Sequence, residues 1–463
     1  MSKLLMQRVT WRGLTLIGFE TVLILSAVLM GSYLRLGTGA FKEGGTDLVL
    51  KGLLIAGICQ LCLYYGDLYD SRVGRDRREL YIRTLRALGA TSLILAGVYF
   101  WLPTLIIGRG VFVITATLVT GLVVGWRVSF DWFATQVGPH ERLLLVGTNP
   151  AAVRLARELY ERKDLGVEIV GFVDTDPARI GQPVLNPGIV GIIEDIPAIV
   201  AARSVDRVVV SLSDARGQLP MDTLLRMKLQ GVTFDHLASV YEEYTGKIAV
   251  ENLRPSWLIF SPGFRKRQTL AVLKRALDVG AAAVGLVLAA PLMLCVAAMV
   301  RLVSRGPSLY RQQRVGEHGR VFTLYKFRSM RTDAEASTGP VWARDQDDRI
   351  IPGGRFLRRT RLDELPQLWN VLRGNMSLVG PRPERPEFVR ELTEAIPFYG
   401  QRHIVKPGLT GWAQVRYSYG ASVGDALEKL QYDLFYIKNL SIALDVFIIF
   451  LTVKTVLLRR GAK

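Results

Sequence analysis

Two adjacent carboxylates, Asp363 and Glu364, lie in the most basic part of the chain. Residues 301–375 contain fifteen lysines and arginines against eight aspartates and glutamates. Because Pro366 is tolerated only in the first turn of a helix, we expect a helix that starts at the carboxylates and ends near residues 374–375. Asp363 would then be its N-cap, where the helix dipole stabilises an ionised carboxylate and attracts phosphate oxygens. Nucleophilic phosphoryl transfer requires such a carboxylate beside a phosphate-binding surface.

The spacing of the two carboxylates favours different roles for them. Neighbouring residues on a helix point about 100° apart, so an acid and base pair acting on one atom is not expected. One carboxylate can attack while the other helps to hold a metal ion or orients a neighbour. The simpler alternative is that the Asp-Glu pair only caps a helix.

Three neighbouring segments carry basic residues toward the same region. "QQRVGEHGRVFTLYKFRSM" predicts a hairpin with a turn at residues 316–319, "GPRPE" fixes an arginine between two prolines, and "KPGLTGWAQV" is rich in turn residues. The basic residues expected at bound phosphates are Arg314, Lys326, Arg328, Arg382 and Lys406. Arginine suits the recognition of phosphate oxygens. The alternative, a solvated basic face that docks on anionic lipid, is compatible with the catalytic role.

A charge-free stretch, "VGAAAVGLVLAAPLMLCVAAMV", precedes this region at residues 279–300. At about 1.5 Å per residue it would form roughly 33 Å of helix, enough to cross a bilayer. Pro291 near its middle predicts a bend, and basic residues at both flanks favour keeping both ends in the cytoplasm. We therefore expect a re-entrant helix that dips into one leaflet and returns. A proline-containing helix that spans the membrane is the alternative.

The N-terminal part of the chain has the composition of a membrane protein. Four apolar segments are each near spanning length: residues 13–34, 48–66, 87–108 and 110–130. The loop after the second segment carries six arginines, which places this loop and the N-terminus in the cytoplasm. A net charge of +18 suits a protein that faces anionic lipid or phosphorylated substrates, with nucleic acid as the rival interpretation.

From Arg142 the pattern changes to that of an α/β domain. Buried strands alternate with amphipathic helices, which predicts a Rossmann-like parallel sheet. The first turn contains Gly147 but lacks the three glycines of a dinucleotide fingerprint, and Asp174 and Asp176 are equally ordinary at the end of a strand. A structural or regulatory module is favoured over a nucleotide-binding one.

The run from about Lys274 to the C-terminus resembles the bacterial sugar transferase family, the monotopic phosphoglycosyl transferases that load a sugar phosphate onto polyprenyl (undecaprenyl) phosphate. The matching motifs are "KRALDV", the proline-broken helix, "YKFRSM", "LDELPQLWNVLRGNMSLVGPRPE", "KPGLTGWAQV" and "YDLFYIKNLS". With its N-terminal bundle and Rossmann-like domain, the chain resembles the long form of the family, found among enzymes that begin exopolysaccharide or O-antigen assembly.

The resemblance implies a ping-pong reaction with Mg²⁺ at the cytoplasmic face of the bacterial inner membrane. Asp363 would attack the β-phosphate of a UDP-sugar, expel UMP and hold the phosphosugar until polyprenyl phosphate collects it. Glu364 would complete the acidic dyad at the metal, and Arg358 would match the family's phosphate-binding arginine. The helix broken at Pro291 would be re-entrant, in contact with inner-membrane lipid. No nucleic acid partner is implied, and a homodimer is compatible with the domain content.

The expected architecture therefore has three parts joined by a linker. It comprises a four-helix transmembrane bundle at residues 1–135, a Rossmann-like α/β domain at 136–255, a linker at 256–273, and an α/β monotopic catalytic domain at 274–463. The final apolar run, residues 440–458, contains Asp445 and Lys454, which are costly at bilayer depth, so we expect an interfacial helix there. Because all the motifs follow residue 260, a chain lacking residues 1–260 is expected to keep some activity.

Two other functions stay open at this point. A membrane-anchored nucleotide-sugar dehydratase or epimerase would share the helices and the sheet domain. It would need a dinucleotide fingerprint and usually a Tyr-x-x-x-Lys pair, and neither occurs in the chain. A non-enzymatic scaffold or nucleotide sensor for polysaccharide assembly would leave Asp363 dispensable.

Overall fold

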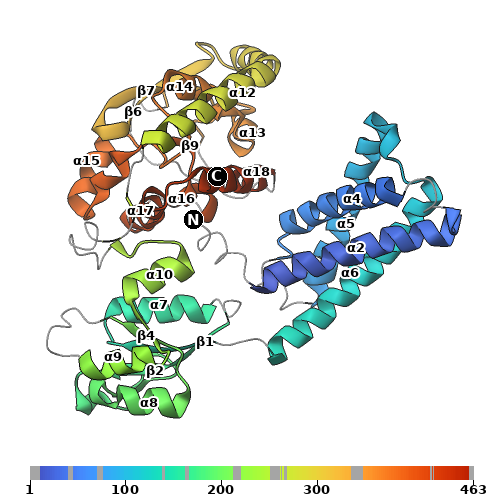
Figure 1. Cartoon of the computed structure of the whole chain (residues 1–463). Helices are drawn as coiled ribbons and strands as arrows, with labels where there is room; N and C mark the ends of the chain where they lie inside the picture. The colour runs from blue at the N-terminus through green and yellow to red at the C-terminus, as the bar shows by residue number, and fades with distance from the viewer. Residues whose placement is uncertain are drawn as a thin grey trace. The chain divides into compact units, whose positions relative to one another are not determined.

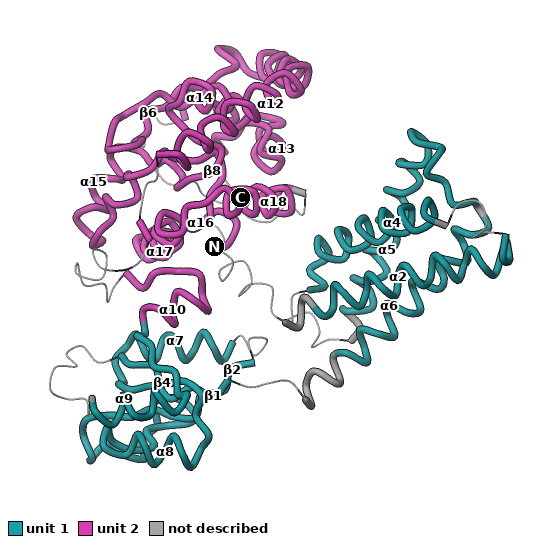
Figure 2. The backbone as a smooth tube through the Cα atoms, viewed as in Figure 1, with its two compact units in different colours: residues 1–237 teal, residues 238–463 magenta. Residues whose placement is uncertain are grey.

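The computed structural model divides into two compact units, residues 1–237 and 238–463 (Figures 1 and 2). The residues that it describes are 11–39, 45–69, 77–137, 141–161, 166–211, 221–250, 261, 263–264, 268–334, 348–417, 420 and 422–457. Each unit is described by itself below.

Long apolar helices fill the described part of residues 11–137. They are α2 (Trp11–Leu36), α4 (Gly45–Tyr65), α5 (Arg77–Trp101) and α6 (Arg109–Val137), with a 3-10 turn, η2 (Pro103–Leu105), before α6. Each is long and apolar enough to cross a membrane, as is α12 (Gln268–Val303) in the second unit. The bundle core contains Ile24, Val28, Leu63 and Val123, none of them measurably exposed.

The predicted bounds of the third apolar segment, residues 87–108, are wrong. The helix α5 begins at Arg77, because the polar residues that precede the apolar run continue the helix although hydropathy excludes them. It ends at Trp101, because Pro103 cannot extend it and starts the turn η2 instead.

A buried ion pair joins the first and last helices of the bundle. Glu20 of α2 lies 2.7 Å from Arg127 of α6, and both side chains are almost fully buried. The Tyr69 hydroxyl donates to the other Glu20 oxygen at 2.5 Å, and Arg127 donates to the Leu68 carbonyl at 2.6 Å. Since breaking such a pair leaves an uncompensated charge, it fixes how these helices align.

The rest of the first unit is an open parallel α/β sheet, as the alternating pattern predicts. Its strands are β1 (Glu141–Val146), β2 (Val167–Asp174), β3 (Ile189–Ile192), β4 (Arg207–Val210) and β5 (Thr233–His236), in the order β3-β2-β1-β4-β5. Helices cover both faces: α8 (Ile196–Arg203) and α9 (Met221–Leu229) one face, and α7 (Pro150–Glu161) the other (Figure 1). Short turns η4 (Pro177–Arg179) and η5 (Ile193–Asp195) complete it.

Asp174 at the end of β2 already has partners within this sheet domain. Its carboxylate accepts a hydrogen bond from Arg179 at 2.7 Å and another from Thr148. The Asp176 side chain accepts from Ala178 N at 2.9 Å and so caps η4. These contacts are those of strand-end and capping residues.

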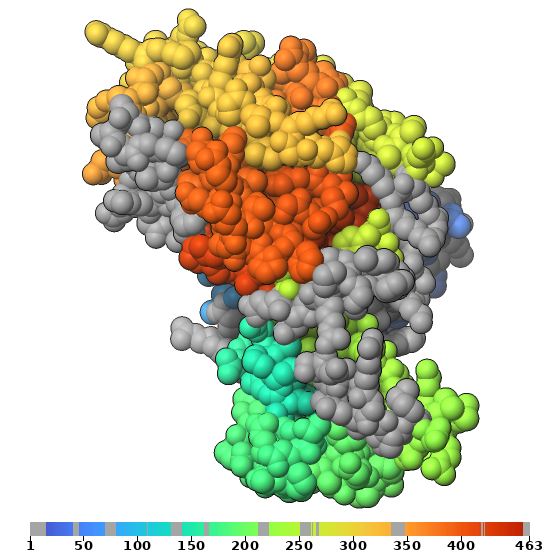
Figure 3. All heavy atoms as spheres, turned by 90° about the vertical axis from the view of Figure 1, so that its left-hand side faces the viewer, coloured from blue at the N-terminus to red at the C-terminus, as the bar shows by residue number. Residues whose placement is uncertain are grey.

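The second unit contains the remaining elements. They are α10 (Leu237–Thr245), α12, β6 (Leu309–Val315), η7 (Glu317–Gly319), β7 (Val321–Phe327), α13 (Gly354–Arg359), η8 (Leu362–Glu364), α14 (Gln367–Arg373), β8 (Ser377–Val379), α15 (Pro386–Ala395), η9 (Tyr399–Ile404), β9 (Gly408–Thr410), α16 (Trp412–Arg416), α17 (Val423–Lys438) and α18 (Ile442–Leu457). The strands β6 and β7 form the predicted hairpin around its turn at residues 316–319. The hairpin lies beside the segment that contains α15 (Figure 3).

Both halves of α12 pack against the core of this second unit. On the first half, Ala282 contacts a cluster that includes Leu324 of β7 and Val371 of α14. On the second half, Val300 joins a cluster that includes Phe327 of β7. The stretch between them is exposed and apolar, with Val287 and Leu288 both 74% exposed. The helix is longer than the predicted residues 279–300, because the polar residues at both flanks are also helical.

The first eleven residues of α12 include two side chains that bond the strand β8. Lys274 donates to the carbonyl of Val379 at 3.1 Å, and Asp278 accepts from the backbone N–H of Leu378 at 3.0 Å. Lys274 also pairs with Asp445 of α18 at 2.7 Å. The charge of Asp445, which would be costly in a membrane-spanning helix, is therefore compensated within the unit. Exposed residues such as Val446 leave an apolar face on α18.

The helix α10 follows β5 directly but makes its contacts in the second unit. Glu242 of α10 lies 2.5 Å from Lys438 of α17. The Trp412 indole donates to the carbonyl of Gly246 at 3.1 Å. Much of the predicted linker, residues 256–273, lies outside the described residues.

Candidate functional site

Asp363 and Glu364 lie in the 3-10 turn η8, between α13 and α14. The prediction that Asp363 is an N-cap is wrong: α14 begins at Gln367 with Pro366 as its N-cap. Pro366 has no N–H to bond the carbonyl of Leu362, so the turn and the helix do not merge. The predicted end is confirmed, since Gly374 caps α14 with a left-handed φ of 88°.

The residue before η8 has an unusual backbone conformation. Arg361 adopts φ 54° and ψ 20°, a left-handed conformation that costs a non-glycine residue about 1 kcal/mol or more. Its guanidinium lies 3.4 Å from Glu364, three residues further along the chain. The strained residue therefore contributes charge to the carboxylate pair.

Glu364 is held by two arginines. Arg382 Nη2 lies 2.8 Å from Glu364 Oε1, and Arg361 approaches the same carboxylate. Burial alone would raise the pKa of Glu364, but the charges of Arg382 and Arg361 lower it to about 2. Glu364 is therefore ionised at any physiological pH and fixes the two guanidinium groups.

Asp363 has no such partner. Its carboxylate makes no hydrogen bond or ion pair with any residue that the structure describes, although it is only 8% exposed. Burial and the neighbouring charge of Glu364 raise its pKa to about 6, while Lys326, Arg382 and Arg358 act in the opposite direction. At neutral pH this carboxylate is ionised, desolvated and without a hydrogen-bond donor, which are the properties of a nucleophile.

Lys326 is brought to the carboxylates by the hairpin and by Asn370. The Asn370 side chain accepts from Tyr325 N at 3.1 Å and donates to Thr323 O at 2.7 Å, so α14 is bound to the edge of β7. Burial and the charge of Arg314 lower the pKa of Lys326 to about 8, while Asp363 is among the groups that raise it. The ammonium group is charged at neutral pH and interacts electrostatically with both carboxylates.

The structure brings together five of the predicted residues. They are Asp363, Glu364, Lys326, Arg382 and Arg358. Arg358 lies on α13, half-buried, and its side chain makes no hydrogen bond or ion pair within the described residues. Its guanidinium group therefore keeps its donors for an anion.

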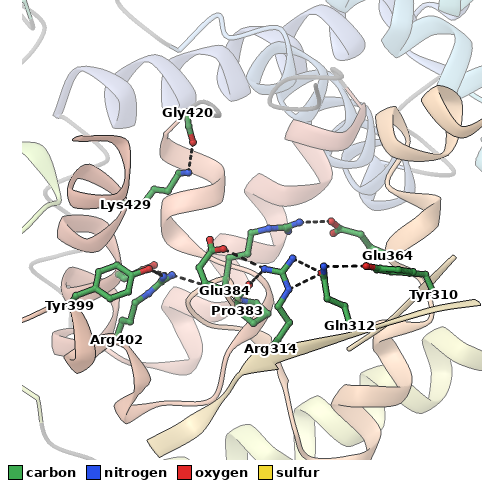
Figure 4. A network of polar contacts seen from close by, with 12 residues as sticks. Tyr310, Gln312, Arg314, Glu364, Pro383, Glu384, Tyr399, Arg402, Gly420 and Lys429 are labelled. Carbon is green, nitrogen blue, oxygen red and sulfur yellow. Dashed lines mark hydrogen bonds and ion pairs between the residues drawn. The ribbon is translucent and has the colours of Figure 1, made fainter. Parts of the chain in front are cut away.

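The other three predicted phosphate-binding residues lie elsewhere or are engaged. Arg314 donates to Gln312 at 2.7 Å and to the Pro383 carbonyl at 2.9 Å, and pairs with Glu384 at 3.3 Å (Figure 4). Lys406 Nζ lies near Gly374, at the end of α14 remote from η8.

Arg328 is a structural residue. It is only 4% exposed, and its guanidinium donates to the carbonyls of Ser304 at 2.7 Å and Arg305 at 2.8 Å. These carbonyls follow the last turn of α12, so Arg328 stabilises the end of the apolar helix. The prediction that Arg328 binds phosphate is therefore wrong. The sequence did not reveal that this side chain is buried.

Two arginines near the site were missed by the sequence analysis. Arg361 is one of four arginines at positions 355–361, and no local signal distinguishes it. Arg402 of η9 is 5% exposed and donates to the carbonyl of Arg382 at 3.0 Å. Only its burial in the folded unit separates it from surface arginines.

The carboxylate pair is a fitting donor set for Mg²⁺. No group of three or more His, Cys, Asp or Glu side chains suited to a metal occurs within the described parts of the chain. Mg²⁺ is commonly held by one or two carboxylates together with waters and substrate phosphates, rather than by an all-protein cage. Asp363, with Glu364 beside it, meets that requirement.

Two sequence families match the chain. The family described as "Bacterial sugar transferase" matches residues 269–459, and the family described as "CoA-binding domain" matches residues 65–219. The first match begins at the start of α12 and includes the whole carboxylate site. The second includes most of the parallel sheet.

Curated relatives match over longer stretches. The "UDP-N-acetylgalactosamine-undecaprenyl-phosphate N-acetylgalactosaminephosphotransferase" of Aeromonas hydrophila is 42% identical over 52% of this chain and 56% of its own length. The "Undecaprenyl-phosphate glucose phosphotransferase" of Komagataeibacter xylinus is 36% identical over 69% of this chain and 60% of its own length. The "UDP-glucose:undecaprenyl-phosphate glucose-1-phosphate transferase" of Xanthomonas campestris pv. campestris is 34% identical over 71% of this chain and 69% of its own length.

The matched region thus spans less than two thirds of the first two relatives and slightly more than two thirds of the third. The motifs on α12, β7, η8 and the loop after β8 all lie within the family match. This protein belongs to the bacterial sugar transferase family.

Proposed function

We propose that this protein transfers a sugar 1-phosphate from a UDP-sugar to undecaprenyl phosphate at the cytoplasmic face of the inner membrane and releases UMP. The observation that carries this proposal is the difference between the two carboxylates. Glu364 is held by two arginines, whereas Asp363 is buried, close to cations and without a hydrogen-bond donor among the described residues. The names of the relatives supply the substrate classes.

The reaction is proposed to occur in two displacements through Asp363. A carboxylate oxygen of Asp363 forms a bond to the β-phosphorus of the UDP-sugar, and the bond from that phosphorus to the oxygen of UMP breaks. A phosphate oxygen of undecaprenyl phosphate then attacks the same phosphorus, and the bond to Asp363 breaks. Both steps conserve charge without a proton transfer to the nucleophile, so the ionised carboxylate is the reactive form.

The cations around Asp363 have separate tasks. Arg382 and Arg358 would bind the non-bridging phosphate oxygens, and Lys326 would balance the charge that accumulates in the transition state. Mg²⁺ held by the Asp363–Glu364 pair would neutralise the diphosphate of the donor. Glu364 keeps Arg382 and Arg361 in place while the substrates exchange.

A re-entrant α12 is proposed because its two ends contact the same compact unit. Lys274 and Asp278 at one end bond β8, and the carbonyls that follow the other end accept from Arg328. A straight helix of 36 residues would be about 54 Å long and would separate these ends by more than a bilayer core. Contact of both ends with one unit supports entry and exit through one leaflet.

The dehydratase and scaffold alternatives receive no specific support. In the sheet domain, Asp174 accepts hydrogen bonds from Arg179 and Thr148. The adjacent carboxylates Asp363 and Glu364 lie instead in η8 of the second unit. A scaffold gives no reason for an ionisable carboxylate that is buried without a partner.

The decisive experiment is to trap the covalent intermediate. The full-length protein is incubated with Mg²⁺ and either UDP-glucose or UDP-N-acetylgalactosamine, the donors suggested by the relatives' names, without undecaprenyl phosphate. Peptide mass spectrometry is expected to find the phosphosugar on Asp363, with one UMP released per protein. Asp363→Asn should abolish both signals, whereas Asp333→Asn, which removes an exposed carboxylate paired with Arg331, should leave them unchanged. Normal turnover by the Asp363→Asn protein would refute the proposal.

A further inference from the structure

Residues 380–384, here called the proline loop, are held at each successive carbonyl from Pro381 to Glu384. The donors to these four carbonyls are, in order, Gly408 N at 2.9 Å, Arg402 Nη2 at 3.0 Å, Arg314 Nη1 at 2.9 Å and Val315 N at 2.9 Å. At the start of the loop, Gly380 N donates to Thr410 O at 2.9 Å. Because these hydrogen bonds fix the backbone of the loop, they also fix the position of the Arg382 Cα, from which the side chain extends to Glu364.

Of these donors, Arg402 acts on the carbonyl of Arg382 itself. Its guanidinium lies 2.8 Å from Asp433 of α17, and the two side chains are 5% and 2% exposed. It also donates to the Tyr399 hydroxyl at 2.6 Å, and Figure 4 shows the two side chains next to each other. Arg402 is thus buried and contacts the proline loop at the backbone carbonyl of Arg382.

A buried ion pair of this kind is a poor source of stability. The cost of removing both charges from water is comparable with their attraction, so hydrophobic residues of similar size would serve equally well. Hydrophobic residues at these positions, however, could not donate a hydrogen bond to the carbonyl of Arg382. The contacts of the pair therefore indicate a geometric role.

We propose that Arg402, fixed by Asp433, is a positioning residue that sets the direction of the Arg382 side chain. Asp433 and Tyr399 hold the guanidinium, the guanidinium holds the carbonyl of Arg382, and the side chain of Arg382 is directed at Glu364. This inference rests on the proposed function, because it assumes that Arg382 binds the donor phosphates beside Asp363. Arg402 would act on the reaction only through Arg382.

A double-mutant cycle tests this dependence in the full-length protein. Arg402→Met is expected to lower kcat/KM for the UDP-sugar by about a hundredfold, the effect of displacing a catalytic group by about 1 Å. Arg382→Met should lower it at least as much. If Arg402 acts through Arg382, the double variant should be no worse than Arg382→Met alone.

Lys438→Met is the matched control. It breaks the ion pair with Glu242, which joins α17 to α10; the Lys438 and Glu242 side chains are 8% and 12% exposed. Its effect should multiply with that of Arg382→Met. Multiplicative losses for Arg402→Met and Arg382→Met would instead overturn the proposal and leave Arg402 a structural residue.

A second variant and a readout without turnover cover the case in which Arg402→Met does not fold. Arg402→Lys keeps a charge for Asp433, but its compact ammonium group lacks the planar fork whose two Nη atoms reach Tyr399 and the Arg382 carbonyl. Hydrogen exchange of a peptide covering residues 380–390 should become faster in Arg402→Lys and stay unchanged in Lys438→Met. Unchanged exchange in Arg402→Lys would overturn the inference. If the wild-type protein transfers no sugar phosphate, the proposed function fails, and the exchange measurement still decides whether Arg402 holds the loop.

Discussion

Arg382 Nη2 lies 2.8 Å from Glu364 and not on Asp363, although the two carboxylates are adjacent in the chain. The charges of Arg382 and Arg361 beside Glu364, together with the burial of Asp363, give the two carboxyl groups different pKa values. The pKa of the paired carboxyl falls to about 2, and the pKa of the unpaired, buried one rises to about 6. Glu364 is therefore a fixed counter-charge, whereas Asp363 is the carboxylate that we propose as the nucleophile.

The pH dependence of kcat/KM should reflect this separation. Asp363 must be ionised, so activity is expected to fall about tenfold per pH unit below pH 6. Lys326 must be protonated, so activity should also fall above about pH 8. Glu364→Gln removes the charge that raises the pKa of Asp363, so its acid limb should move to lower pH by about one unit. Asp333→Asn should leave both limbs in place, and an unmoved acid limb in Glu364→Gln would contradict the assignment.

Asp363→Asn should give a more stable protein. Its pKa is above the ordinary value of 3.8 in the fold, so the ionised carboxylate destabilises the folded state at neutral pH. Replacing it should raise the free energy of unfolding by about 1 kcal/mol or more at pH 7.5. The difference should shrink as the pH falls through 6 and vanish below about 4, because wild-type Asp363 is then protonated in both states. Thermal unfolding in detergent over this pH range measures it; a constant difference would be inconsistent with titration of Asp363.

Membrane topology can be tested by cysteine labelling. With the three native cysteines replaced by alanine, Arg305→Cys at the end of α12 should label from the same side as Ser71→Cys in the arginine-rich loop. Thr38→Cys, between α2 and α4, should label from the opposite side. The expectation follows from the contacts of both ends of α12 with one unit. Labelling of Arg305→Cys together with Thr38→Cys would mean that α12 spans the bilayer.

Truncation should find a boundary at α10. The motifs all follow residue 260, which predicts that a chain lacking residues 1–260 keeps some activity. The contacts of Glu242 with Lys438 and of Gly246 with Trp412 instead place α10 among the elements that support the second unit. A chain that begins at Leu237 is expected to fold and transfer sugar phosphate. One that begins at residue 261 should lose about 3 kcal/mol or more of stability. Equal melting temperatures would show that α10 is not needed.

The sequence was sufficient for features that depend on local chemistry. The hairpin follows from its glycine turn, the end of α14 from Gly374, and the membrane character of the first helices from their length and hydropathy. The grouping of Asp363 and Glu364 with basic side chains follows from an acidic pair in a basic stretch of sequence. Each of these signals lies within a few residues of the element that it predicts.

The sequence was insufficient where an arginine's role depends on distant partners. The sequence does not distinguish Arg382 from Arg328 and Arg314. In the structure, however, Arg328 and Arg314 donate hydrogen bonds to backbone carbonyls. Whether a guanidinium group is available to bind substrate depends on its burial and on partners in distant segments. Arg314, for example, bonds Glu384, which is 70 residues away in the sequence. The N-cap prediction failed for a related reason, because the conformation of Arg361 starts a tight turn before the helix.

The left-handed conformation of Arg361 sets two selective pressures against each other. Glycine would adopt this backbone geometry without strain, so screening a variant library for thermostability should enrich glycine at position 361. Screening the same library for turnover should retain arginine, since glycine removes one of the two cations beside Glu364. Position 361 is therefore a place where directed evolution for heat tolerance and for catalysis would diverge.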